Sequence, residues 1–203
     1  MAVITISRQF GAGGRTLGIR LAKKLKYQFL DDAVIQELSK RARVTTNAVK
    51  DIERSGGTMF SKIISSMLSK DYMERLTGDR IGYIDEDIYV AKLKEVITEF
   101  ARMDNVVILG RGGQYILQDM ENAFHVELIA NKKDRIKFMQ QHYKYSDYKA
   151  LQAVRDGEKR RKALYAKLKK KDYEHPDLYH VVINTSRVSI DQAVDIISNL
   201  VKK

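Results

Sequence analysis

The sequence predicts an α/β fold built around a parallel sheet. Short β-branched apolar runs alternate along the chain with segments whose apolar residues recur at helical spacing. The apolar runs are continuous rather than alternating, which is typical of parallel strands buried on both faces. The chain has 203 residues, 44% of them hydrophobic, so it suits one domain, or one domain with a smaller insert, and can form a full core.

The chain opens as a strand, a glycine-rich loop and a helix. The loop contains Gly11, Gly13 and Gly14, and a second short strand ends at the carboxylate pair Asp31-Asp32. We expect strands over Ala2–Ser7 and Tyr27–Leu30, and helices over Thr16–Lys26 and Ala33–Arg43.

The stretch from Val44 to Met103 contains no clear strand and is expected to be a mostly helical insert. Apolar residues recur at helical spacing over Met59–Leu68 and again over Ile88–Arg102. Breaks are expected at Ser55-Gly56-Gly57 and near Thr77-Gly78.

The second half returns to alternating strands and helices. We expect strands over Asn105–Leu109, Phe124–Ala130 and Leu178–Ile183, and helices over Asp134–His142 and Ser189–Leu200. The stretch Arg155–Lys171 is strongly basic and lacks a comparable apolar stripe. Ligands of parallel sheets bind where the strands end, and Asp31, Arg111 and Asn184-Thr185-Ser186 all follow predicted strands.

Composition excludes several classes of protein. The absence of cysteine rules out a disulfide scaffold, thiolate metal sites and a cysteine nucleophile. The four histidines show no metal-ligand spacing. No signal peptide and no apolar run long enough to cross a bilayer are visible, so we expect a cytoplasmic protein with no membrane partner. The formal net charge of +11 predicts anionic partners.

The loop from Ser7 to Thr16 is the clearest candidate for an anion site. A glycine-rich turn between a strand and a helix leaves backbone N–H groups free to surround a phosphate, and the helix dipole adds to the attraction. The hydroxyl of Thr16 could coordinate Mg²⁺ or contact phosphate. The strict pattern GxxxxGK[ST] is not matched, because no lysine follows the glycines. A plain strand-to-helix turn and a degraded dinucleotide fingerprint ending at Asp31-Asp32 are the alternatives.

Three stretches carry a specific resemblance. They are Ile4–Gly18 (ITISRQFGAGGRTLG), Val107–Gly112 (VILGRG) and Leu178–Ser186 (LYHVVINTS). In this order they resemble the cytidylate kinase-like family, a branch of the P-loop nucleoside monophosphate kinases. The resemblance implies a three-layer P-loop kinase fold over residues 1–203, with a helical acceptor-binding insert at 44–103 and a basic lid at about 150–175.

The resemblance also implies roles for individual residues. ATP would lie on the loop, with Mg²⁺ near Thr16, and the acceptor would lie near Asp31 and Arg111. Arg15 would supply the charge of the family lysine, which falls opposite Gly14, and it would act with Arg160 and Arg161 in catalysis. The ATP-binding residues would be Gly11, Ala12, Gly13, Gly14, Arg15 and Thr16, and the lid residues Arg155, Lys159, Arg160 and Arg161.

Alternatives to these roles remain open on the residues alone. Asp31 and Asp32 could simply cap the following helix, and the stretch Arg155–Arg161 could be a solvated basic helix. Asn184-Thr185-Ser186 could contact the base or cap a turn.

The leading functional hypothesis is ATP- and Mg²⁺-dependent phosphoryl transfer to a nucleoside monophosphate, with CMP or dCMP first. A nucleotide-binding sensor or partner protein with little transfer activity is the main alternative, and a kinase of another small acceptor is a variant. A nucleic-acid binder ranks low, since no RRM, KH or zinc motif is present. The helical insert could mediate a homodimer. Arg8, Arg15, Arg111 and the stretch Arg155–Arg161 are expected to converge on one cleft.

Overall fold

The computed structural model describes residues 2–54 and 86–201. The helix expected over Met59–Leu68 and the breaks expected near Gly56 and Gly78 lie outside these residues. None of the described helices is long and apolar enough to span a bilayer.

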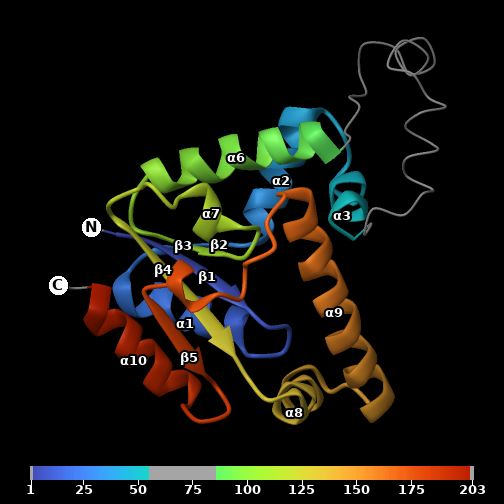
Figure 1. The fold of residues 1–203 in the computed structure, drawn as a ribbon, viewed down its shortest axis with the longest axis vertical. Coiled ribbons are helices and arrows are strands. Elements are labelled where there is room, and N and C mark those ends of the chain that lie inside the picture. The colour runs from blue at the N-terminus through green and yellow to red at the C-terminus, as the bar shows by residue number, and fades with distance from the viewer. Residues whose placement is uncertain (1, 55–85, 202–203) are drawn as a thin grey trace.

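The centre of the fold is a five-stranded, all-parallel sheet in the order β2-β3-β1-β4-β5 (Figure 1). The first strand is central, with β3 on one side and β4 on the other. The order therefore reverses beside β1, and such a switch point opens a crevice at the carboxyl ends of the strands. The strands are β1 (Val3–Arg8), β2 (Gln28–Leu30), β3 (Val106–Leu109), β4 (Ala123–Ile129) and β5 (Val181–Asn184).

Helices cover both faces of the sheet, giving the three layers expected from the sequence. The helices are α1 (Gly14–Leu25), α2 (Asp32–Ala42), α3 (Thr46–Arg54), α6 (Glu86–Arg102), α7 (Gly113–Ile116), α8 (Lys132–Tyr143), α9 (Asp147–Lys167) and α10 (Ile190–Val201). On one face α1 and α10 lie side by side; α2 and α6 cover the other (Figure 1).

The two faces of β1 show how the sequence positions these layers. Val3 packs in the core cluster that contains α2 and α6, whereas Ile4 and Ile6 pack in the cluster that contains α1 and α10. Successive side chains of a strand point to opposite faces, so an apolar run is required for burial on both sides.

The strands and helices predicted within residues 2–54 and 86–201 are present, with differences at their ends. The last strand begins at Val181 rather than Leu178, because a 3₁₀ turn over Pro176–Leu178 precedes it, with proline at its first position. The basic stretch lies within α9, which begins at Asp147. Ser146 caps that helix by accepting a hydrogen bond from the Lys149 N–H.

The stretch 44–103, which was expected to be one insert, includes a helix that belongs to the core of the fold. Tyr89, Leu93, Val96 and Ile97 of α6 are fully buried in the same cluster as Val3. α6 is therefore a core helix, since its apolar face covers the sheet. Of the described residues, only the segment of α3 is left as a candidate for the acceptor-binding part of the insert.

Leu93→Ala should destabilise the whole domain by about 2–5 kcal/mol, because it leaves a cavity between α6 and the sheet. Denaturant unfolding measures the change. Lys94→Ala, at the exposed neighbouring position, is the control and should stay within about 0.5 kcal/mol of the parent chain. An unchanged midpoint for Leu93→Ala would mean that α6 does not stabilise the sheet.

The stability should also depend on pH through His125 of β4. Burial, and secondly the neighbouring His180, lower the pKa of His125 to about 4. An unfolded histidine titrates near pH 6.5, so only the unfolded chain gains this proton between about pH 6.5 and 4. Stability should fall as the pH drops through that window and show no further loss from this group below it. In His125→Asn the slope should flatten, whereas in His142→Asn, at an exposed position, it should not.

Candidate functional site

The glycine loop, residues 9–16, joins β1 to the first turn of α1 and presents backbone N–H donors. Gly11 and Gly13 have φ of +89° and +83°, which favours glycine because an L side chain is strained there. Within the described residues, the N–H groups of Gly11 and of residues 13–16 have no protein acceptor. Three of these donors belong to the first turn of α1, so the loop and the helix dipole form a site suited to a phosphate group.

A contact from β5 fixes this loop. The Thr185 hydroxyl donates to the carbonyl oxygen of Ala12 at 3.1 Å, and Ser186 accepts a hydrogen bond from the Asn131 N–H. These residues were expected either to contact a base or to cap a turn. In the structure their hydroxyls bind backbone groups of neighbouring loops.

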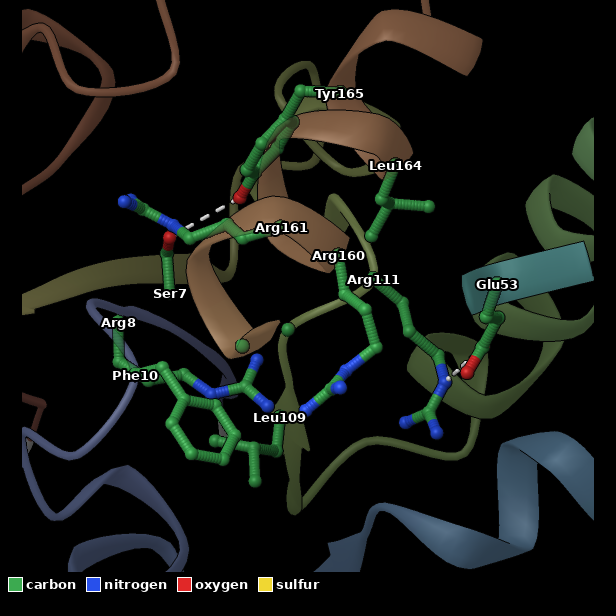
Figure 2. A pocket seen from close by; sticks show the side chains of 12 residues that line it. Ser7, Arg8, Phe10, Glu53, Leu109, Arg111, Arg160, Arg161, Leu164 and Tyr165 are labelled. Carbon is green, nitrogen blue, oxygen red and sulfur yellow. Dashed lines mark hydrogen bonds and ion pairs between the residues drawn. The ribbon is translucent and has the colours of Figure 1, made fainter. Parts of the chain in front are cut away.

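Two cavities adjoin the loop. The loop cavity, about 250 Å³, is lined by the glycine loop, Asp31 and the aromatic residues Phe138, Tyr143 and Tyr145. The arginine cavity, about 150 Å³, lies between β1, β3 and α9 and is lined by four arginines: Arg8, Arg111, Arg160 and Arg161 (Figure 2). Arg8, Phe10 and Leu109 line both cavities, so the two lie next to each other.

Arg15 faces the carboxylates that follow β2. Its guanidinium lies 3.1 Å from Asp31 and 3.4 Å from Asp32, and its side chain is about half exposed, at 51%. The charge of Arg15 is thus directed along the rim of the loop cavity and is partly neutralised by two carboxylates.

Arg111 is held in a strained turn at the end of β3. Its φ is +53°, and the flanking Gly110 and Gly112 also have left-handed backbone conformations. The chain therefore reverses direction sharply at this point. Its guanidinium lies 3.1 Å from Asp31 and 3.0 Å from Glu53 of α3. Although burial acts to lower the pKa of Arg111, these two carboxylates raise it above its usual value. Arg111 is therefore a fully charged group whose position is fixed by the carboxylates of Asp31 and Glu53.

The register of α9 decides which of its cations face the site. Gly157, Arg160, Arg161 and Leu164 line the arginine cavity, as expected for positions three and four apart on one helical face. Arg155 and Lys159 are exposed and line neither cavity. Arg155 and Lys159 share one face of α9, as the sequence indicated, but that face is opposite to the face that lines the arginine cavity.

Arg161 forms a buried ion pair rather than a free cation. Its guanidinium donates to Glu127 of β4 at 2.7 Å and to Glu174 at 2.9 Å, and Glu127 is almost completely buried. Burial raises the pKa of the Glu127 carboxyl, an effect that Arg161 opposes. Figure 2 shows Arg161 turned away from Arg160. This pair anchors α9 to the sheet.

Arg160 points into the arginine cavity. Within the described residues it has no ion pair, and its guanidinium carbon lies 5.6 Å from the centre of the Phe10 ring. Of the cations predicted for the lid, Arg160 is the one that lines the arginine cavity without a carboxylate partner among the described residues.

α9 packs directly on the glycine loop. A Cβ on Gly157 would overlap the ring of Phe10, so the loop and the helix meet where only glycine fits. Next to this contact, Glu158 accepts hydrogen bonds from the Phe10 N–H at 2.7 Å and from Arg135 at 2.8 Å. α9, which contains the basic stretch expected to form a lid, thus packs against the loop.

The residues of the loop cavity fit a magnesium ion brought in by phosphates. Thr16 and Asp31 supply a hydroxyl and a carboxylate to one cavity, and Mg²⁺ in such sites commonly takes one or two carboxylates together with phosphate oxygens. The described residues contain no cluster of three or more His, Cys, Asp or Glu that could hold a metal by itself.

Comparison with known proteins agrees with this geometry. The sequence model of the cytidylate kinase-like family matches residues 3–187. The chain belongs to the cytidylate kinase-like family. No curated protein matches the sequence.

Solved structures share the fold of this family member at low sequence identity. An uncharacterised protein from Eubacterium ventriosum has a TM-score of 0.68 and 17% identity, with 99% of this chain and 98% of the other covered. Shikimate kinase from Bacteroides thetaiotaomicron has a TM-score of 0.53 and 14% identity, with 100% and 99% covered. The YorR protein of Bacillus subtilis, in complex with phosphorylated GDP, has a TM-score of 0.51 and 15% identity, with 99% and 96% covered. These similarities establish the P-loop kinase fold.

Sequence analysis missed the acidic residues that organise the site. Glu53, Glu127 and Glu158 each bind an arginine, and none was singled out. Glu127 did leave a signal, because it is a carboxylate in the middle of an apolar strand. Glu53 and Glu158 lie on helices rich in charge, where the sequence does not distinguish them from solvated residues.

A double-mutant cycle tests the contact between α9 and the loop. Gly157→Ala should destabilise the protein by about 1–3 kcal/mol, because the new methyl group overlaps Phe10. In the Phe10→Ala background the same change should stabilise by up to about 1 kcal/mol, since alanine favours helix over glycine. Denaturant unfolding of the four chains measures both effects. An equal effect of Gly157→Ala in both backgrounds would contradict the packing described.

Proposed function

We propose that this family member is an ATP-dependent kinase that transfers a phosphoryl group to a small acceptor, with CMP or dCMP as the leading acceptors. The observation that carries the proposal is the juxtaposition of a loop of unpaired backbone donors with a cavity lined by arginines. Phosphoryl transfer requires little covalent chemistry from the protein; it requires positioning of the two substrates and neutralisation of charge.

On the donor side, the N–H groups of the glycine loop would bind the ATP phosphates, and Thr16 with Asp31 would orient the nucleotide's Mg²⁺. When bound, Mg²⁺ neutralises charge on the phosphate oxygens. The aromatic residues Phe138 and Tyr143 line the loop cavity and would pack beside the bound nucleotide.

On the acceptor side, Asp31 and Arg111 would bind the second substrate, together with Glu53. Carboxylates accept hydrogen bonds from hydroxyl or amino groups, whereas the Arg111 guanidinium suits a phosphate or carboxylate. Asp31 also bridges Arg111 and Arg15, at 3.1 Å from each. A change in the acceptor side would therefore be transmitted to the rim of the loop cavity.

Between the two sides, Arg160 would contact the transferred phosphoryl group, with Arg15 at the rim. Arg161 is paired with the carboxylates of Glu127 and Glu174, so we assign to it the positioning of α9 rather than contact with substrate. Arg155 and Lys159, on the exposed face, would not contact the nucleotide.

A different small acceptor is the second candidate. The carboxylates of Asp31 and Glu53 beside Arg111 suit a polyhydroxylated acid as well as a nucleotide, and one structural neighbour is a shikimate kinase. A nucleotide sensor without efficient transfer remains the alternative if no acceptor is phosphorylated, since Gly14 stands where the resemblance places the family lysine and no lysine follows the glycines.

The proposal predicts Mg²⁺-dependent formation of ADP from ATP with one acceptor of a panel. The panel comprises CMP, dCMP, UMP, AMP, GMP and shikimate, ADP is measured by a coupled assay, and the phosphorylated product by ³¹P NMR. Chelation of Mg²⁺ should abolish turnover. ATP binding in calorimetry without any transfer would favour the sensor, and absence of nucleotide binding would contradict both functions.

Asp31→Asn should raise the KM for the acceptor by about tenfold or more, because it loosens the carboxylate that holds Arg111 and Arg15. Asp195→Asn, which removes an exposed carboxylate of α10, is the matched control and should change neither kcat nor KM. An unchanged KM in Asp31→Asn would remove Asp31 from the acceptor site.

A further inference from the structure

The side chain of Arg8 takes an unusual course across the glycine loop. Arg8 ends β1, and a Cβ built on Gly14 would lie only 2.9 Å from its Cγ. A Cβ built on Gly110 would overlap its Nη1 atom. The stem of Arg8 thus occupies the space that any side chain at position 14 would need, and its guanidinium lies under the turn at the end of β3.

Arg8 pairs with no carboxylate among residues 2–54 and 86–201. Within the described residues no hydrogen bond or ion pair involves its side chain, while Arg15, Arg111 and Arg161 each have carboxylate partners. Burial, and secondly the proximity of Arg111, lower the pKa of Arg8. A guanidinium in such a place is stable when an anion completes its surroundings.

Arg8 also lines both cavities. It appears in the wall of the loop cavity beside Gly13 and Gly14, and in the wall of the arginine cavity beside Arg160. Figure 2 shows the guanidinium groups of Arg8 and Arg160 both pointing into the arginine cavity, from β1 and from α9. The boundary between the cavities is where a phosphoryl group would pass from donor to acceptor.

We propose that Arg8 is the phosphate-binding cation of this site and replaces the lysine of the strict P-loop motif. In GxxxxGK[ST] the first position is glycine and the seventh is lysine. In the register that the family resemblance implies, with the family lysine opposite Gly14, the first position is Arg8 and the seventh is Gly14, and Thr16 lies one residue beyond the Ser/Thr of the strict pattern. The two positions have exchanged the small residue and the cation, and the packing of Arg8 over Gly14 gives the physical reason why both must change together.

This role rests on the proposed kinase function and makes it more specific. A lysine presents a compact point charge, whereas the planar guanidinium of Arg8 can donate to two oxygens at once. From the boundary it can donate to oxygens of the donor phosphate and of the transferred group. Arg15, which lies on the rim with Asp31 and Asp32, is not needed as the substitute.

A reciprocal exchange tests the proposal. Arg8→Gly and the neutral, shorter Arg8→Gln should each lower kcat by about 100-fold or more, and weaken ATP–Mg²⁺ binding in calorimetry by about tenfold. Gly14→Lys alone should also be impaired, because the new stem overlaps Arg8. The double variant Arg8→Gly with Gly14→Lys should regain at least tenfold over Arg8→Gly. Arg20→Ala, an exposed arginine of α1, is the control and should leave both readouts unchanged.

The outcomes separate this role from a structural one. Thermal unfolding verifies that each variant is folded, and a merely structural Arg8 would not be replaced by a lysine at a different position. Turnover and ATP affinity within twofold of the parent in Arg8→Gln would overturn the role of Arg8 and leave the kinase function standing. If the variants rank in the expected order of ATP affinity but the parent chain phosphorylates no acceptor, the phosphate-binding role of Arg8 would be supported and the kinase function rejected. No ATP binding by the parent chain would reject both.

Discussion

The concentration of positive charge at the carboxyl ends of β1 and β3 is the constraint on which the rest of the site depends. Buried or half-buried guanidinium groups are stable only where carboxylates or a bound anion offset them. Three of the arginines are offset within the protein: Arg15 by Asp31 and Asp32, Arg111 by Asp31 and Glu53, and Arg161 by Glu127. Arg8 and Arg160 have no such partner among the described residues, and both line one cavity. The remaining charge thus has a definite position between two layers of the fold.

The attachment of α9 follows from the same constraint. The Arg161–Glu127 pair is desolvated, so removal of either partner would leave an unpaired buried charge and loosen the helix. The contact of Gly157 with Phe10 sets the distance between the helix and the glycine loop. Together these contacts orient Arg160 toward the cavity without its needing a carboxylate. Of the two arginines of α9 that line the arginine cavity, Arg161 therefore holds the helix to the sheet and Arg160 faces the cavity.

Several glycines of the site are required because neighbouring side chains fill the space that a side chain at these positions would occupy. Gly14 and Gly110 leave the volume through which Arg8 reaches the cavities, and Gly157 leaves the volume filled by Phe10. A glycine-rich loop is ordinarily explained by its backbone donors and its positive φ angles, which Gly11 and Gly13 provide here. Gly14 has a different reason, because its φ is not in the left-handed region and its neighbour is a side chain.

The sequence by itself determined the parallel α/β fold, the glycine-rich turn between β1 and α1, and the family resemblance. Those features depend on the periodicity of apolar residues and on the local placement of glycines, which a chain shows without being folded. It could not determine which of its arginines are free, since the carboxylates that neutralise them lie far away in the chain: Glu53 for Arg111 and Glu127 for Arg161. Nor could it place α6 in the core, or turn Arg155 and Lys159 away from the site. Ion pairing and helix register depend on approach in three dimensions, and only the tertiary structure decided them.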